Sequence, residues 1–236
     1  MKTLKSILFL ALLALPFKNL LAHALWIETP LNGKIGQVQQ VNIFYGEYAT
    51  QEKEAPAKWY SDVNQFSLWL IKPGKEKIKL QVKETENGFT TSFTPTVQGQ
   101  YALSVVHEAK ELGGTTKYEF SSYAIVNVGN IKAQADVPNL LKTVFKSHKV
   151  HQINQEVEFQ VLLNNNAFAK GKVMIFSPEG WSKECIADEN GYITFKPVWK
   201  GFYVLEASNY EKTNGTHHGK TYDASWQGAT SGIFIH

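Results

Sequence analysis

The segment FTPTVQGQYAL at residues 93–103 returns as FKPVWKGFYVL at residues 195–205, and this pair decides the fold. Both copies place Phe, Pro, Gly, Tyr and Leu at the same five positions without a gap, and a Gly-aromatic pair precedes each copy. The pattern indicates a strand, a corner set by Pro and Gly, and a second strand with Tyr and Leu on one face. Such a unit is typical of the late hairpin of an immunoglobulin-like sandwich. Its repetition therefore predicts two related β-sandwiches in tandem.

The rest of the chain fits an all-β protein, because short runs rich in β-branched and aromatic residues are separated by turn signals. Helix is expected only as a turn or two near residues 61–64 or 137–141. We predict an all-β fold of two immunoglobulin-like or transthyretin-like β-sandwich domains, the first at residues 23–130 and the second at residues 138–236. Strands are expected over residues 37–45, 66–71, 76–82, 118–128, 156–163, 172–177, 192–195 and 202–207.

Residues 1–22 predict a secretory signal peptide. A basic start and an apolar run over residues 7–15, too short to span a bilayer, precede small residues at Ala22 and Ala24. Cleavage after Ala22 would make His23 the first residue, with an α-amine and an imidazole that can chelate a metal together. Cleavage after Ala24 would remove it, and the sequence allows both. We therefore expect a periplasmic or secreted protein that does not insert into a membrane after cleavage.

The charge balance argues against nucleic acid as a partner. The chain has 24 basic and 21 acidic residues, and three of the lysines lie within the predicted leader, so the mature chain is balanced. It contains no arginine, which excludes bidentate guanidinium clamps. Its single cysteine, Cys185, excludes an internal disulfide. Alternation around Cys185 predicts a thiol that points into the core of the second domain.

Histidines are the main candidates for chemistry, because neutral imidazole is a common ligand of zinc, copper and nickel. His107 and Glu108 follow a predicted strand at residues 101–106, and His217 and His218 lie in a glycine-flanked loop. In such a loop both rings can converge on one ion, although an exposed polar loop explains the same pattern. No HExxH or CxxC spacing occurs, so the signal is one of composition.

Aromatic residues leave another option open. Trp59-Tyr60 and Trp226 fall in loop-like stretches, where they can stack on a sugar ring or pack inside the protein. No Gly-x-Ser-x-Gly motif, phosphate loop or dinucleotide fingerprint occurs, and the carboxylates are too scattered to name a glycosidase pair.

Four motifs carry a resemblance to a known family. They are AHALWIE at residues 22–28, YGE at 45–47, SPEGW at 177–181 and GKTYDASWQGAT at 219–230. Together they resemble the DUF4198 family over nearly the whole mature chain. The resemblance implies a secreted β-sandwich protein that handles metal, of a kind often labelled as a periplasmic component of nickel or cobalt uptake.

The interpretation that follows is a periplasmic protein, not an enzyme, that binds a divalent transition metal, nickel or cobalt, for delivery to a membrane uptake transporter. The rival is a copper enzyme similar to lytic polysaccharide monooxygenases, in which His23 as first residue and a second histidine form a histidine brace. A third interpretation is a carbohydrate-binding or surface-adhesion module without metal. The expected metal ligands are His23, His107, His217 and His218, with Glu108 as an oxygen ligand.

Overall fold

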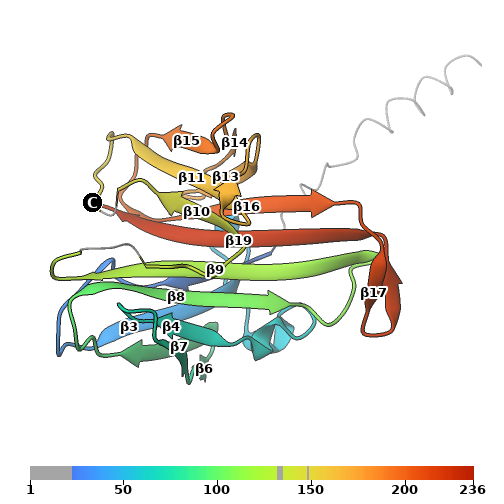
Figure 1. Cartoon of the computed structure of the whole chain (residues 1–236), viewed down its shortest axis with the longest axis horizontal. Helices are drawn as coiled ribbons and strands as arrows, with labels where there is room; N and C mark the ends of the chain where they lie inside the picture. Colours follow the sequence, from blue (N-terminus) through green and yellow to red (C-terminus); the bar gives the residue numbers. More distant parts are fainter. Residues whose placement is uncertain (1–22, 132–134, 148) are drawn as a thin grey trace, which may run out of the picture.

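The structure is a computed structural model that describes residues 23–131, 135–147 and 149–236. The predicted leader lies outside the described residues. Within them the chain is nearly all β, and its helical turns fall in one segment of the first half (Figure 1). The predicted all-β sandwich fold is confirmed. No helix in the described part of the chain is both long enough and apolar enough to span a membrane.

The first half of the chain forms a sandwich of two layers. One layer has the strand order β1-β3-β7-β6, and the other has the order β9-β8-β4-β5. Neighbouring strands within each layer run antiparallel. The strands are β1 (Ala24–Glu28), β2 (Asn32–Gly33), β3 (Gln39–Gly46), β4 (Leu68–Ile71), β5 (Lys77–Leu80), β6 (Lys83–Thr85), β7 (Gly88–Phe93), β8 (Gly99–Glu108) and β9 (Thr116–Val128).

The second half repeats this arrangement. β10, β11 and β15 take the places of β1, β3 and β7, while β19, β16, β13 and β14 take the places of β9, β8, β4 and β5. β12 pairs with the end of β11, and the small hairpin β17-β18 lies between β16 and β19. The strands are β10 (Leu141–Phe145), β11 (Val157–Leu163), β12 (Asn166–Ala167), β13 (Lys172–Phe176), β14 (Ser182–Ile186), β15 (Tyr192–Phe195), β16 (Gly201–Glu211), β17 (Gly215–His217), β18 (Lys220–Tyr222) and β19 (Ala224–Ile235).

Each copy of the repeated segment ends in the same backbone anchor. The hydroxyl of Tyr101 donates to the carbonyl of Val97 at 3.0 Å and accepts from its N–H at 3.2 Å. The hydroxyl of Tyr203 accepts from the N–H of Trp199 at 3.2 Å. In both halves a tyrosine reaches the backbone four residues upstream, which fixes the corner between the two strands. These strands lie in different layers, β7 and β15 in the smaller ones and β8 and β16 in the larger ones, so each repeated segment is a corner between layers and not the predicted hairpin.

The glycine of each copy is required by close packing. A Cβ at Gly99 would lie 2.6 Å from the side chain of Pro73, and one at Gly201 would lie 2.8 Å from Pro178. Both glycines also have φ in the left-handed region, at 136° and 128°, where other residues are strained. The two prolines follow the corresponding strands β4 and β13. Both copies of the sequence repeat thus make the same glycine-proline contact in the folded protein.

The two sandwiches share a sheet, which the sequence did not predict. β9 and β19 pair in parallel, from Thr116 opposite Ala224 to Tyr123 opposite Ser231. This pairing joins the larger layers of both halves, together with β2, into one sheet of nine strands (Figure 1). Two long strands that would otherwise be exposed edges thereby satisfy each other's backbone groups.

Side-chain alternation shows that the two smaller layers cover opposite faces of the shared sheet. On β16, Tyr203 and Leu205 enter the core under β10, β11 and β15, whereas Phe202 and Val204 point to the other face and pack against Trp26 of β1. Parallel pairing, reversed strand order and opposite faces together describe an approximate two-fold rotation about the direction of β9 and β19.

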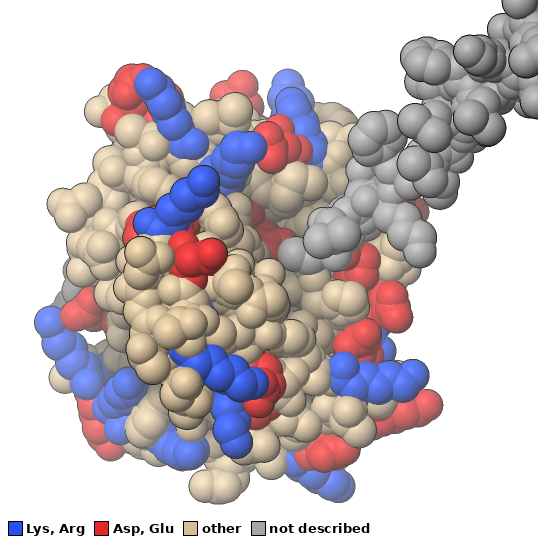
Figure 2. Space-filling model, turned by 90° about the vertical axis from the view of Figure 1, so that its right-hand side faces the viewer, with Lys and Arg blue, Asp and Glu red and all other residues tan. Residues whose placement is uncertain are grey.

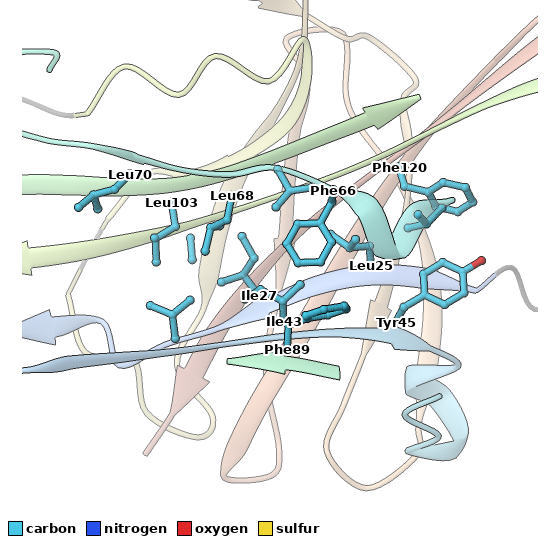
Figure 3. Close-up of a cluster of buried hydrophobic side chains, with 14 of the residues drawn as sticks. Leu25, Ile27, Ile43, Tyr45, Phe66, Leu68, Leu70, Phe89, Leu103 and Phe120 are labelled. Carbon is cyan, nitrogen blue, oxygen red and sulfur yellow. The ribbon is translucent and has the colours of Figure 1, made fainter. Parts of the chain in front are cut away.

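Each half keeps a hydrophobic core of its own. In the first half, Leu25, Ile43, Leu103 and Phe120 come together from β1, β3, β8 and β9 (Figure 3). Full burial of one such side chain contributes about 1.5–3 kcal/mol. The halves are therefore held separately by their cores and jointly by the shared sheet and the Trp26 contact.

Candidate functional site

The first half carries a segment that has no counterpart in the second. Residues 47–67, called the strap below, connect β3 to β4, whereas residues 164–171 make the corresponding connection from β11 to β13. The strap contains three 3₁₀ turns, η2 (Tyr48–Thr50), η3 (Pro56–Lys58) and η4 (Val63–Gln65). The last of these overlaps the helical turn expected at residues 61–64; the one expected at 137–141 is absent, and β10 begins there instead.

Tyr48 fastens the strap to the second half. Its hydroxyl donates to the carbonyl of Phe202 at 2.5 Å, and its ring packs edge-on against Trp26, with 5.3 Å between ring centroids. A further edge contact joins Tyr48 to Phe176 of β13, at 6.4 Å. The strap therefore lies at the seam, the boundary where the first half packs on β13 and β16 of the second.

His23 lies immediately before β1, next to the strap. Its Nε2 lies 3.1 Å from Oε1 of Glu54, a strap residue, and its ring stacks on Tyr45 of β3 at 5.6 Å and 19°. The side chain is 42% exposed, so solvent and small ions can reach it. Glu54 orients the imidazole and favours its Nε2–H tautomer, which leaves Nδ1 as the unprotonated ring nitrogen.

Two buried carboxyl groups, Glu47 and Glu206, one from each half, influence each other electrostatically, and His23 influences Glu47. Glu47 caps η2 by accepting from the N–H of Ala49 at 3.3 Å, while its other oxygen, Oε2, is buried without a hydrogen-bond partner among the described residues. Burial raises the pKa of Glu47, against the Ala49 N–H and the nearby His23 imidazole, which lower it. Glu206 of β16 is only 7% exposed, and burial and the nearby Glu47 raise its pKa to about 8.

Sequence reasoning did not name Glu47, Glu54 or Glu206 as site residues. Glu206 carried a usable signal, because it is the one charged residue within the predicted strand at residues 202–207. A carboxylate in a buried strand is costly unless it is paired, hydrogen-bonded or bound to a metal. Glu47 and Glu54 carried no such signal, since both lie in a polar connection.

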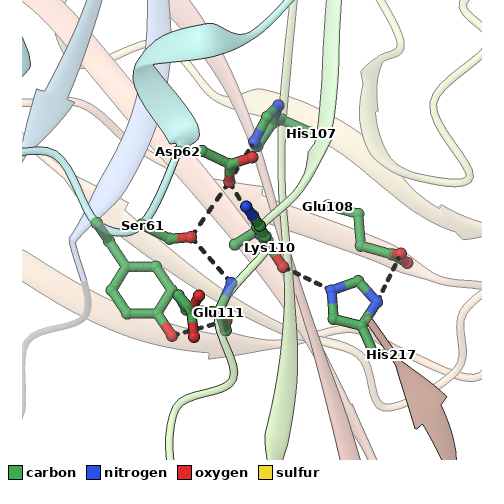
Figure 4. A network of polar contacts seen from close by, with 9 residues as sticks. Ser61, Asp62, His107, Glu108, Lys110, Glu111 and His217 are labelled. Carbon is green, nitrogen blue, oxygen red and sulfur yellow. Dashed lines mark hydrogen bonds and ion pairs between the residues drawn. The ribbon is translucent and has the colours of Figure 1, made fainter. Parts of the chain in front are cut away.

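The structure separates His107 from Glu108. The predicted strand ended at residue 106, but β8 continues to Glu108, so the two side chains point to opposite faces of the sheet. His107 turns to the strap, where its Nε2 lies 3.0 Å from Oδ1 of Asp62 (Figure 4). Burial opposes ionisation of Asp62, but hydrogen bonds from the Lys110 N–H and His107 outweigh it and lower its pKa to about 2.

His217 is a buried structural contact between the β17-β18 hairpin and the first half. It is 7% exposed, and its Nε2–H donates to the carbonyl of Ala109 at 2.8 Å. Its Nδ1 lies 3.3 Å from Oε1 of Glu108 (Figure 4). The other carboxylate oxygen of Glu108 lies 2.7 Å from Nζ of Lys117. Both ring nitrogens of His217 are thus occupied by protein groups. The adjacent His218 packs its ring edge-on against His217, at 4.5 Å.

The five predicted ligands therefore fall into separate environments. His23 contacts Glu54 of the strap, His107 contacts Asp62, and Glu108 and His217 contact each other. Across residues 23–131, 135–147 and 149–236, no group of three or more His, Cys, Asp or Glu side chains is already arranged to hold a metal ion.

The exposed tryptophans are not the ones that the sequence suggested. Trp59 is buried in the first core, 4% exposed, and Trp226 packs on Phe120 at 5.6 Å. Trp181 and Trp199 are more open to solvent, 40% and 36% exposed, with 6.1 Å between ring centroids. On the face shown in Figure 2, lysines and acidic residues are mixed, without a large patch of one sign.

Comparisons with known proteins assign no family to this chain. No family model matches the chain, and no curated protein matches it. Solved structures match the chain as well, and three of them do so at low similarity. The native conformation of Escherichia coli alpha-2-macroglobulin has a TM-score of 0.27 and 10% identity, and the match covers 92% of this chain and 14% of that one.

The other two matches are of the same kind. A putative membrane anchored protein from Corynebacterium diphtheriae has a TM-score of 0.28 and 12% identity, over 88% of this chain and 59% of that one. The BSP domain of a biofilm associated protein has a TM-score of 0.21 and 10% identity, over 89% and 29%. The chain thus spans less than two thirds of the length of each of these three proteins.

Proposed function

We propose that this chain is a periplasmic or secreted protein that binds a divalent transition metal, nickel or cobalt, for an uptake system. The observation that carries the proposal is the half-exposed His23 beside the strap, where Glu54 orients its ring and where it influences Glu47, whose Oε2 is buried without a hydrogen-bond partner among the described residues. The motifs that resemble the DUF4198 family point the same way. We therefore place the metal at the N-terminal end of β1 and not on the β17-β18 hairpin, where His217 is already engaged.

The chemistry follows from the predicted leader cleavage after Ala22. The released α-amine and Nδ1 of His23 would close a six-membered chelate ring around one ion, while Nε2–H stays with Glu54. Nitrogen and oxygen donors suit nickel, cobalt and copper. A half-exposed site without thiolates exchanges its ion with solvent, as a carrier requires.

The test is calorimetric titration of Ni²⁺, Co²⁺ and Cu²⁺ into mature protein that begins at His23. Replacement His23→Ala should lower affinity by about 100-fold or more, since loss of even an outer-shell partner costs 10–100-fold. An added Gly-Ser before His23 should have a similar effect, because it removes the terminal amine. His218→Ala is the matched control and should change nothing. Absence of binding by the unaltered protein, or binding that survives His23→Ala, would contradict the proposal.

The copper enzyme is an outcome of the same titration. A histidine brace takes a second imidazole, and among the described residues the side-chain contacts of His23 are with Glu54 and Tyr45. Selective Cu²⁺ binding together with reductant-dependent peroxide formation would replace the carrier by an enzyme.

A carbohydrate-binding module is the second candidate, and the exposed pair Trp181 and Trp199 supports it. Tilted indoles 6.1 Å apart present a face on which a sugar ring can stack. Titration with oligosaccharides should then quench tryptophan fluorescence, and Trp181→Ala should abolish the change. Metal binding without any response to sugars would remove this candidate.

A further inference from the structure

The approximate two-fold rotation relates the seam to a second boundary, where the second half packs on β4 and β8 of the first. Trp26 of β1 lies opposite Phe44 of β3, and Lys142 of β10 lies opposite Leu162 of β11. Both pairs lie five residues along β3 or β11 from the partner of the repeated phenylalanine of the corner segment. Lys142 therefore occupies in the second half the position that Trp26 occupies in the first.

The two equivalent positions have different surroundings. Trp26 packs with Tyr48 of the strap and with aromatic side chains of the second half. At the second boundary a cavity of about 170 Å³ is present instead, and Lys142 lies on its wall. The apolar part of the wall comes from both halves and includes Tyr123, Ile125, Val137, Val144 and Leu162. The second boundary thus combines an apolar space with one ammonium group.

Lys142 is buried without a carboxylate partner. It is 6% exposed, and its Nζ donates to the carbonyl of Val137 at 2.7 Å and to Oδ1 of Asn165 at 2.8 Å. Among residues 23–131, 135–147 and 149–236 it forms no ion pair. Burial lowers the pKa of Lys142, against the nearby Asp136, which raises it. A buried ammonium held only by neutral acceptors is costly unless an anion compensates its charge.

We propose that this cavity binds a small monocarboxylate with a branched or aromatic apolar part. Two acceptors leave Lys142 one of its three N–H donors for the carboxylate, and the amide nitrogen of Asn165 is a second donor. The volume suits such a ligand, because a cavity of about 150 Å³ is enough for benzene. Asp136 also lines the cavity, but it is 67% exposed and paired with Lys75 at 3.4 Å, so its charge is screened. The site does not include His23 and needs no metal.

The test is calorimetric titration of the mature protein with benzoate and with 3-methylbutanoate, in the absence of metal. Lys142→Met keeps the length of the side chain and removes its charge. It should lower the affinity for both ligands by about 10–100-fold, the effect of losing one hydrogen bond to a charged group. Benzyl alcohol, which has the ring without the carboxylate, should bind the parent about 10-fold or more weakly than benzoate does.

Lys146→Met is the matched control. Lys146 directly follows β10, and its exposed side chain pairs with Glu158 at 2.6 Å, so this variant should bind both ligands as the parent does. Val144→Phe is a second test, because it adds volume to the cavity wall and leaves Lys142 in place. It should weaken binding of both carboxylates.

Three outcomes would overturn the proposal. Absence of binding by the parent at millimolar ligand would leave Lys142 as a structural link between Val137 and Asn165. Binding that survives both Lys142→Met and Val144→Phe would place the ligand elsewhere. Equal affinity for benzoate and benzyl alcohol would exclude the carboxylate as the recognised group. If Lys142→Met does not fold, Val144→Phe and the comparison with benzyl alcohol decide.

Discussion

The two halves of the molecule share a topology but differ in the connection between corresponding strands. After β3 the first half inserts the strap, residues 47–67, whereas after β11 the second half continues through residues 164–171. The strap supplies Glu47 and Glu54 to the seam and Asp62 to the contact with His107. The strand topology is thus common to both halves, whereas Glu47, Glu54 and Asp62 come from an insertion that only the first half has.

The largest expected effect comes from detaching the strap. Tyr48→Ala removes a buried hydroxyl contact to Phe202 and the ring contacts to Trp26 and Phe176. We expect a loss of about 3–5 kcal/mol in the free energy of unfolding, as for other large core truncations. Denaturant titration measures it, with Tyr210→Ala, 58% exposed, as the control that should change little. A loss below about 1 kcal/mol would mean that the strap does not hold the halves together.

The next effect compares the two repeated corners. The hydroxyl of Tyr101 makes three hydrogen bonds, to the N–H groups of Thr96 and Val97 and to the carbonyl of Val97, whereas that of Tyr203 bonds the Trp199 N–H. Tyr101→Phe should therefore destabilise by about 2 kcal/mol and Tyr203→Phe by about 1 kcal/mol. Equal losses in denaturant titration would show that the two corners are energetically equivalent despite this difference.

A smaller effect is the pH-dependent contribution of Asp62, a strap residue, to the free energy of unfolding. Because the pKa of Asp62 is lowered to about 2 from its usual value near 3.8, its carboxylate stabilises the fold above pH 4. That contribution is lost as pH falls from about 4 to 2. Asp62→Asn should cost about 1 kcal/mol or less at pH 6, given solvent screening, and nothing at pH 2.

Thermal melts across this pH range provide the measurement for Asp62. Asp136→Asn serves as the control, because Asp136 forms an exposed ion pair with Lys75. If the cost of Asp62→Asn were the same at pH 2 and pH 6, the ionised carboxylate would have no part in holding the strap.

The smallest effect concerns the second half, where Cys185 of β14 is half-buried against the core and burial raises the pKa of its thiol. Since the thiolate is the reactive form, labelling with a maleimide should be slow in the native protein and fast in denaturant. Equal rates would show that β14 opens freely at the edge of the shared sheet.

Sequence reasoning predicted the parts that depend on local pattern. The Phe-Pro-Gly-Tyr-Leu repeat and its alternation predicted the strand-corner-strand units β7-β8 and β15-β16, because Gly99 and Gly201 meet a proline that only glycine permits. The prediction that each unit is a hairpin is wrong, because β7 and β15 lie in the smaller layers whereas β8 and β16 belong to the shared sheet. It did not predict the parallel pairing of β9 with β19, since that contact forms only between two completed halves. It did not predict the seam either, because no local pattern relates Glu47 to Glu206.

One hydrogen bond has a consequence for how the chain folds in time. The hydroxyl of Thr230 on β19 donates to the carbonyl of Leu25 on β1, joining residues 205 apart in the sequence at 2.6 Å. Contacts of such separation slow folding, because loop closure must precede any reward. The contact between β1 and β19 therefore cannot form until the last strand is available. A nascent chain that ends before β19 also lacks the strand that pairs with β9 and β16. We expect slow refolding and nascent chains that depend on chaperones until the C-terminal strand emerges.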